Sequence, residues 1–424
     1  MQTADFIRGL QKHIGKMKSM EKPEFDSVQI TLFGLLAEAL FGYPYVSPEN
    51  TDWERVFRES YLQGVHMIAF QHPERHGIPS ELQNRFKAIF RKYAMRNLKI
   101  GQQHTVIHRL MTEHNIPYCI LKGLSSADYY PDSFLRGLGD VDFLVHREDF
   151  EIAEQILLES GFKKREGKDT DYHAVYDKNG CKFEMHRDFA ELWDESARAI
   201  VHRYRDTMIR ESIRVQTSGN VYMSPSKFHH GLILLLHTQQ HLLTEGIGLR
   251  HLCDWAVFVH SFPEDEFVQL FRDKLQEIGL WRFAQILSLS SSIAIKLPEK
   301  NWMDPTERNK RLAAALLLDF LDGGNFGVKD QNRNRVYESK LYKNREKGQV
   351  YNAFASLNDW VRGKWPWVTR CPILLPIGWV YFVFHRLILV IKGERKHLKL
   401  GKTVENSQKR KKIYRELKLF QPES

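Results

Sequence analysis

Residues 139 to 145 read Gly139-Asp140-Val141-Asp142-Phe143-Leu144-Val145. An apolar, β-branched run that follows a glycine predicts a buried strand. Successive side chains of a strand alternate between its faces, so Asp140 and Asp142 point the same way, about 6–7 Å apart. Two carboxylates against a buried strand repel each other unless a cation lies between them. Clustered carboxylate oxygens are typical ligands of a hard divalent cation such as Mg²⁺.

The composition is that of a globular protein with two or three domains. The 424 residues are 42% hydrophobic and 12% aromatic, which supplies a core and excludes general disorder. The first residues lack the apolar run of a secretory signal. Four scattered cysteines, with no Cys-x-x-Cys pair, are too few for a disulfide scaffold. We therefore expect a cytoplasmic protein.

The net charge of +10 is unevenly distributed. Residues 331–424 contain 21 Lys or Arg and 7 Asp or Glu, a net charge of +14, whereas the remaining 330 residues carry −4. A basic segment attracts polyanions, so RNA or an anionic membrane surface is a possible partner. Simple solubility is an equally good explanation of the same charge.

The hydrophobic pattern divides the chain into four parts. Helical spacing dominates the first and third parts, whereas short apolar runs and turns dominate the second. The predicted parts are an N-terminal helical region (1–115), a core (116–215), a helical region lining the cleft (216–325) and a basic C-terminal region (326–424).

The core predicts a mixed sheet with helices against it. Short strands are expected at 118–121, 140–145, 162–166, 173–177 and 181–186, with helices at 124–130 and 148–160. Lys178-Asn179-Gly180 is a strong hairpin signal between the last two strands. The predicted fold class is α/β (α+β), flanked by N- and C-terminal helical regions.

A third carboxylate occurs in Lys182-Phe183-Glu184-Met185-His186, where Glu184 alternates with apolar neighbours. If this strand lies beside the first one, Glu184 completes a cage with Asp140 and Asp142. Three carboxylates can hold two divalent ions about 4 Å apart. Taken alone, Glu184 is better explained as a solvent-facing residue of an edge strand.

These motifs resemble a known family. The run Ile120-Leu121-Lys122-Gly123, then Tyr130-Pro131, Arg136, Gly139–Asp142 and Phe183–His186 is similar to the uncharacterised nucleotidyltransferase family of bacteria. That family belongs to the polymerase-beta-like nucleotidyltransferase superfamily. The resemblance is strongest over 116–190, and it extends more loosely over 50–260. The turn Lys122-Gly123-Leu124-Ser125 departs from the superfamily's common Gly-Ser dipeptide.

The resemblance implies a nucleotidyltransferase-like fold and an enzyme that uses Mg²⁺ or Mn²⁺ with a nucleoside triphosphate (NTP). Asp140, Asp142 and Glu184 would be both the catalytic residues and the metal ligands. Glu184 could also help to deprotonate the acceptor hydroxyl. The acceptor itself stays open, as does the oligomeric state.

The resemblance also implies a nucleotide-binding set around the first turn. Backbone N–H groups near Gly123 would meet the triphosphate, and the Lys122 ammonium would pair with phosphate. Alternatively, Lys122 is a strand-end lysine in water, and Arg136 pairs with Asp132 at the surface. The full set is Lys122, Gly123, Ser125, Ser126, Arg136 and Gly139.

Four further residues are candidates for acceptor binding or for a supporting role. His186 shares a face with Glu184 and could orient a carboxylate, and His173 is a weaker candidate of the same kind. A structural histidine is the alternative for both. Arg250 and Asp254 could line the acceptor pocket, although their spacing first suggests an intrahelical salt bridge.

Two other signals stand outside this site. His237 and His241 share a helix face and could bind zinc, but no Glu follows His237 as in a zinc-protease motif, so a polar face near the cleft is preferred. Residues 371–391 form an apolar segment that is too short to be assigned as membrane-spanning. We expect a buried helix there, with a membrane-interface helix as the alternative.

The sequence therefore predicts transfer of a nucleoside monophosphate from an NTP to a hydroxyl or phosphate acceptor, with release of pyrophosphate. One alternative is a non-catalytic nucleotide-binding or scaffold module that has kept the fold. Another is an RNA-modifying transferase that grips RNA with its basic tail. The expected location is the cytoplasm, with peripheral association at the inner face of the membrane as the alternative.

Overall fold

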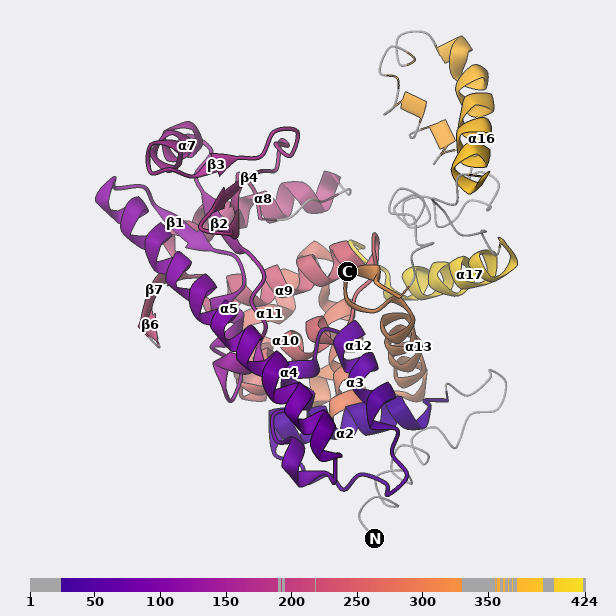
Figure 1. The fold of residues 1–424 in the computed structure, drawn as a ribbon. Coiled ribbons are helices and arrows are strands. Elements are labelled where there is room, and N and C mark those ends of the chain that lie inside the picture. Colours follow the sequence, from indigo (N-terminus) through magenta and orange to yellow (C-terminus); the bar gives the residue numbers. More distant parts are fainter. Residues whose placement is uncertain are drawn as a thin grey trace.

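A computed structural model gives the fold of the chain (Figure 1). Residues 1–23 of the predicted N-terminal helical region and much of the basic C-terminal region (326–424) lie outside the described residues. The described residues are 24–329 without 190, 191, 193, 194 and 218, followed by 355, 357–358, 361–362, 365, 368, 372–391 and 400–421.

Five strands form one mixed sheet in the order β1-β2-β5-β4-β3. Strands β2 and β5 are parallel, whereas the other neighbouring pairs are antiparallel. The predicted mixed sheet is confirmed, although the strand expected at 162–166 has only two residues. The strands are β1 (Tyr118–Ile120), β2 (Val141–Val145), β3 (Lys163–Lys164), β4 (His173–Lys178) and β5 (Cys181–His186).

The hairpin between β4 and β5 fixes the register of β5. Lys178 pairs with Cys181, so Asn179 and Gly180 form a two-residue loop. Both have positive φ, 53° and 67°, as a type I′ turn requires. This predicted turn sets which residues of β5 lie opposite β2.

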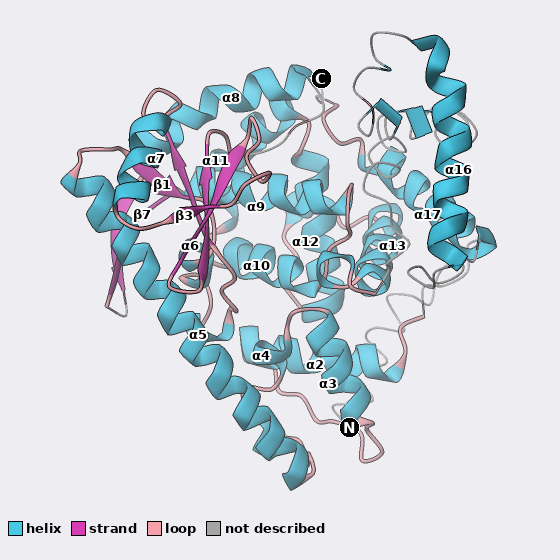
Figure 2. Ribbon diagram, turned by 45° about the horizontal axis from the view of Figure 1, so that its top comes forward, coloured by secondary structure: helices cyan, strands magenta, loops and turns pink. Residues whose placement is uncertain are grey.

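The sheet separates two hydrophobic cores. On one face, Val141, Phe143 and Val145 pack in a core that includes residues of α5 (Ser80–Glu113) and α7 (Phe150–Glu159). On the other face, Leu144 joins the core of the helical region. Figures 1 and 2 show α7 and the C-terminal part of α5 beside the sheet, whereas the N-terminal part of α5 runs along the helical bundle. Alternation along β2 therefore leaves Asp142 and Leu144 facing the bundle.

The helical region packs around one large core. Trp255 is fully buried there, and its indole Nε1 donates to Ser288 Oγ at 2.9 Å. Gly231 allows close packing, because a Cβ at this position would lie 2.6 Å from Phe271. The helices are α2 (Ser27–Phe41), α3 (Trp53–Leu62), α4 (His66–Ala69), α9 (Lys227–Leu242), α10 (Leu249–His260), α11 (Glu264–Ile278), α12 (Trp281–Ile295) and α13 (Glu307–Gly323).

Three elements between residues 187 and 224 have no counterpart in the sequence prediction. They are helix α8 (Glu195–Arg210) and a hairpin of β6 (Ile213–Thr217) and β7 (Asn220–Ser224). Strand β7 packs on α5, but most side chains of β6 are exposed or half-buried. The residues of β6, Ile213-Arg214-Val215-Gln216-Thr217, do alternate between apolar and polar, so the sequence contained a signal that the prediction did not use.

Helix α17 (Leu400–Leu417) is part of the helical core. Tyr414 is buried, and its hydroxyl donates to the carbonyl of Leu242 at 3.0 Å. The basic residues of this helix are therefore not all exposed. Lys409 and Lys412 are exposed, whereas Arg410 is buried, because it shares the inward face with Tyr414 and Leu417.

Helix α16 (Leu375–Ile391), preceded by a 3₁₀ turn at Pro372–Leu374, has one packed side. Trp379 Nε1 donates to Asn358 Oδ1 at 2.9 Å. The expected burial is wrong for the opposite side, where four apolar side chains are more than half exposed. These are Ile373, Ile377, Val380 and Phe384. Among the described residues, no helix has both the length and the apolar character needed to cross a bilayer.

Candidate functional site

The parallel pairing of β2 and β5 places two carboxylates side by side. Asp142 lies directly opposite Glu184 in the register, and both side chains lie on the face of the sheet toward the helical bundle. Asp140 comes one residue before β2. Glu184 is on a central strand and its side chain is 16% exposed, so its explanation as a solvent-facing edge residue is wrong.

Basic side chains lie between the three carboxylates. Lys182 Nζ is 2.5 Å from Glu184 Oε1 and 3.1 Å from Asp140 Oδ2. Lys122 Nζ is 3.3 Å from Asp142 Oδ1, so this lysine is not a strand-end residue in water. The carboxylates are therefore joined into one network with the two ammonium groups.

His186 completes this network. Its Nε2 is 3.3 Å from Asp142 Oδ1 and 3.5 Å from Glu184 Oε2. His173 stacks on His186 with ring centroids 5.2 Å apart. His186, at the end of β5, thus contacts the carboxylates directly, whereas His173, at the start of β4, stacks behind it.

The pKa values of the two aspartates move in opposite directions. Burial and then the charge of Asp140 raise the pKa of Asp142 to about 6. Burial opposes ionisation of Asp140 as well, but the ammonium groups of Lys122 and Lys182 outweigh it and lower its pKa to about 2. Two close carboxylates resist simultaneous ionisation, so the more buried one holds its proton longer.

Glu184 and His186, both on β5, favour their charged forms. Burial opposes ionisation of Glu184, but His186 and Lys182 hold its pKa far below the ordinary value. Burial also disfavours the charged form of His186, but its contacts with Asp142 and Glu184 raise its pKa. The site therefore combines closely spaced negative and positive charges in a region with little solvent.

The donor atoms fit a divalent metal ion. Ligand atoms of Asp142, Glu184 and His186 lie within 4.8 Å of one another. Asp142 is 1% exposed, and within the described part of the chain its buried Oδ2 has no hydrogen-bond partner. A buried oxygen without a partner is unfavourable unless something else binds it. Two carboxylates and an imidazole are suitable ligands for such a group.

The turn after β1 resembles a phosphate-binding turn, in which a glycine leads into the start of a helix, but the helix here is short. Gly123 has φ of 79° and precedes α6 (Leu124–Ala127), which has only four residues. Ser125 and Ser126 are buried, and neither hydroxyl has a hydrogen-bond partner among the residues that the structure describes. Gly139 is exposed at the start of the Asp-x-Asp segment.

Arg136 is buried, which contradicts its pairing with Asp132 at the surface. Its Nε and Nη2 each donate to a carboxylate oxygen of Asp254 at 2.8 Å. Its Nη1 donates to the carbonyl of Gly123 at 3.1 Å, so Arg136 ties α10 to the turn after β1. Asp132 instead accepts from the backbone N–H of Phe134.

The spacing of Arg250 and Asp254 suggested an intrahelical salt bridge, but Asp254 has other partners. Besides Arg136, it accepts from the hydroxyl of Tyr130 at 2.7 Å. The Arg250 guanidinium lies over the ring of Phe326, 5.1 Å from its centroid. A bidentate guanidinium from another segment satisfies the carboxylate better than a helical neighbour does.

Lys182 is the residue of this site that the sequence prediction missed. It contacts two of the three carboxylates. The signal was present, because Lys182, Glu184 and His186 alternate with the buried Cys181, Phe183 and Met185. Three polar residues on one face of a strand share one environment.

Comparison with known proteins adds one finding. Residues 49–290, more than half of the chain, match the family described as uncharacterised nucleotidyltransferase. No curated protein matches the chain significantly. The matched residues include β1, β2, β5 and the paired Arg136 and Asp254. On this basis the chain belongs to the uncharacterised nucleotidyltransferase family, whose name assigns it a general role in nucleotidyl transfer.

Proposed function

We propose that the protein is a metal-dependent enzyme of the polymerase-beta-like type. It would transfer a nucleoside monophosphate from an NTP to a hydroxyl or phosphate acceptor and release pyrophosphate. The observation that supports this most strongly is the register of β2 and β5, which sets Asp142 against Glu184; among the described residues, Asp142 Oδ2 has no hydrogen-bond partner.

Asp140, Asp142 and Glu184 would hold Mg²⁺ or Mn²⁺, with His186 orienting the carboxylates. Such ions neutralise phosphate charge and activate an attacking oxygen. The acceptor oxygen would form a bond to the α-phosphorus while the bond to the α–β bridging oxygen breaks, so pyrophosphate leaves with that oxygen and the proton of a hydroxyl acceptor passes to water. Glu184 suits the role of an ionised ligand better than that of a base, because its low pKa makes it a weak proton acceptor.

Lys122 and Lys182 have a second role in this proposal. Without a nucleotide they neutralise the carboxylates. Their side chains are flexible, so the ammonium groups would pair with the triphosphate when it binds. Gly123, Ser125 and Ser126 would offer donors to the same phosphates. Arg136 is a positioning residue, since its three hydrogen bonds hold the Gly123 turn against α10.

The direct test follows a label from the α-phosphate. We expect label from at least one α-labelled NTP to enter an acceptor in a cell extract, with equal release of pyrophosphate. Both signals should require Mg²⁺ or Mn²⁺ and disappear with a chelator. Absence of transfer with all four NTPs and both metals would contradict the enzymatic proposal.

A non-catalytic nucleotide-binding module is the second candidate. It is favoured by the network itself, in which Lys122, Lys182 and His186 already balance three carboxylates. Calorimetry with ATP and Mg²⁺ separates the two proposals. Heat of binding without pyrophosphate release in any extract would identify the module.

The C-terminal region would hold the enzyme at an anionic membrane. Exposed Ile373, Ile377, Val380 and Phe384 recur at helical spacing, and the sequence around them is rich in Lys and Arg. An apolar helix face with basic flanks is typical of binding to a membrane interface. An RNA-modifying transferase would use the same positive charge for RNA.

We expect the full chain to sediment with vesicles that contain anionic lipid and to stay in solution with purely zwitterionic vesicles. The double change Ile377→Glu/Val380→Glu should abolish sedimentation. Leu158→Glu, at an exposed apolar position of α7, is the matched control and should leave it unchanged. Equal sedimentation of both variants, or salt-sensitive binding to tRNA alone, would contradict the membrane proposal.

A further inference from the structure

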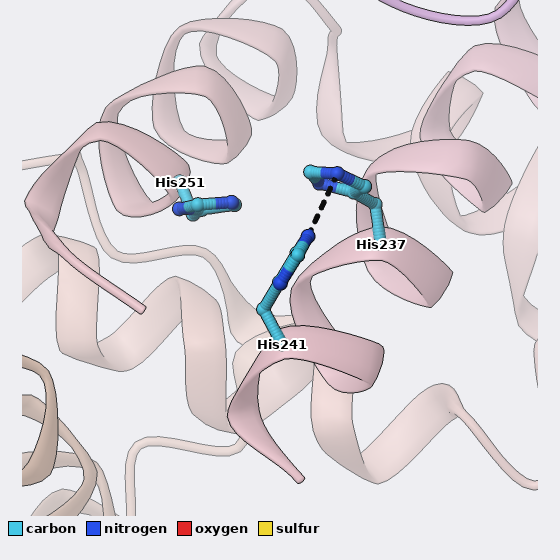
Figure 3. Close-up of side chains that lie close together, drawn as sticks. All are labelled: His237, His241 and His251. Atoms are coloured by element: carbon cyan, nitrogen blue, oxygen red, sulfur yellow. Dashed lines mark hydrogen bonds between the residues drawn. The ribbon is translucent and has the colours of Figure 1, made fainter. Parts of the chain in front are cut away.

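Three histidines from two helices converge beside the carboxylate network (Figure 3). His237 and His241 lie one turn apart on α9, and His251 lies near the start of α10. One ring nitrogen of each lies within 4.8 Å of the others. The Nε2 atoms of His237 and His241 are 3.1 Å apart.

These imidazoles have few of the partners that buried histidines normally have. His251 is 4% exposed, and neither of its ring nitrogens has a hydrogen-bond partner within the described residues. Burial lowers the pKa of all three rings, far below the ordinary value for His237 and His251. At neutral pH the rings are therefore uncharged and offer lone pairs, as metal ligation requires.

The surroundings orient the rings toward one another. The Glu245 carboxylate lies 3.4 Å from Nδ1 of His241, which leaves Nε2 of that ring facing the cluster. A carboxylate behind a histidine is the usual support of a zinc ligand. Phe326 packs against His241 and His251, with ring centroids 4.9 and 5.6 Å apart, and partly shields them.

We propose that His237, His241 and His251 bind one transition-metal ion of the zinc class, separate from the ions proposed for the carboxylates. Zinc–nitrogen bonds of about 2.0–2.1 Å in tetrahedral geometry place two ligand nitrogens roughly 3.3 Å apart, close to the observed separation. A cavity of about 20 Å³ borders His237 and His251, and the cationic Lys122, Arg136 and Arg250 line it together with the carboxylate of Asp254. It has room for roughly one water, which would be the fourth ligand.

Lys122 links this site to the carboxylates. Its Nζ is 3.3 Å from Nε2 of His237, the atom that would bind the metal, and also 3.3 Å from Asp142 Oδ1. The ammonium and the metal ion exclude each other at His237. Metal binding would therefore move Lys122 fully onto Asp142, and removal of Lys122 should strengthen metal binding.

The test titrates the chelator-treated full chain with Zn²⁺ or Co²⁺ in the presence of millimolar Mg²⁺, which saturates the carboxylates. We expect one ion per chain and visible d–d absorption from the bound Co²⁺. His251→Gln and His241→Gln should each weaken binding at least ~100-fold, and Glu245→Gln about 10-fold. Lys122→Met should tighten it.

His260→Gln is the matched control, because His260 is exposed at the far end of the same helix as His251. It should bind the metal as the unaltered chain does. Circular dichroism checks that each variant folds, and X-ray absorption of the zinc-loaded unaltered chain should show imidazole nitrogen ligands. Unchanged affinity in His251→Gln, or ligation by oxygen alone, would overturn the proposal.

Discussion

Asp142→Asn should reduce nucleotide transfer about 10³-fold while leaving the fold intact. Asp142 is central to the site, since it lies opposite Glu184 and contacts Lys122 and His186. Asparagine keeps the shape of the side chain but removes the charge that would hold a metal and the phosphates. Loss of one such electrostatic contribution typically reduces the rate by about 10²–10³-fold, and a metal ligand contributes at the upper end.

The measurement is pyrophosphate release per enzyme at saturating NTP, with the acceptor identified by the labelling experiment. Glu151→Gln is the matched control, because this exposed carboxylate on α7 lies outside the site. It should keep full activity. If Asp142→Asn also kept full activity, the carboxylate network would have no part in catalysis.

Arg136→Met should produce the largest loss of stability among single changes in the core. It leaves the Asp254 carboxylate buried without its bidentate partner. Breaking a buried ion pair from one side typically costs about 3–5 kcal/mol. The change also releases the carbonyl of Gly123, so the turn after β1 should loosen. Urea denaturation should show a lower midpoint, and the chain should express less well.

The chain contains a well-matched control for this change. Arg165 forms the same fork with Asp177, at 2.5 and 2.6 Å, but both side chains are more than a third exposed. Arg165→Met should lower the free energy of unfolding far less than Arg136→Met does, because water screens this exposed pair. In the double variant Arg136→Met/Asp254→Asn, part of the stability should return, because no charge is left unpaired. Equal losses for Arg136→Met and Arg165→Met would contradict this account.

Local patterns predict the sheet and the acidic residues well. Alternation in residues 140–145 and 181–186 identifies β2 and β5, and Asn179-Gly180 fixes the hairpin. Alternation does not predict which strand pairs with β2, because strand pairing depends on the tertiary structure. The family resemblance supplied that step, and the register then set Asp142 against Glu184.

The partners of Arg136 and Lys182 could not be derived in the same way. Arg136 and Asp254 are 118 residues apart, whereas Arg250 is four residues from Asp254 and was the natural local partner. The position of Lys182 on the same strand face as Glu184 could have been predicted, but a single lysine is usually exposed to solvent. Local rules thus favoured nearby partners where the fold provides distant ones.

Two elements escaped prediction although their sequences carried a pattern. Ile213 and Val215 alternate with polar residues in β6, and the buried Ala197, Val201 and Met208 of α8 recur at helical spacing. The apolar stretch at 371–391 led to a wrong prediction of burial. Its composition suggested burial, yet Ile377 and Phe384 are exposed at 63% and 61%. The composition of a segment shows how many apolar side chains it has, but whether other residues bury them depends on the fold.

The core of the helical region is complete only once α17 has been synthesised. Tyr414, Leu417 and Phe420 are buried in the same core as α12 and α13. At about 5–20 residues per second, the ribosome needs on the order of 5–20 s to pass from Gly323 to Phe420. Throughout that interval the apolar surface under α17 faces water. During those seconds a chaperone that binds exposed apolar segments would have its largest binding surface on the nascent chain.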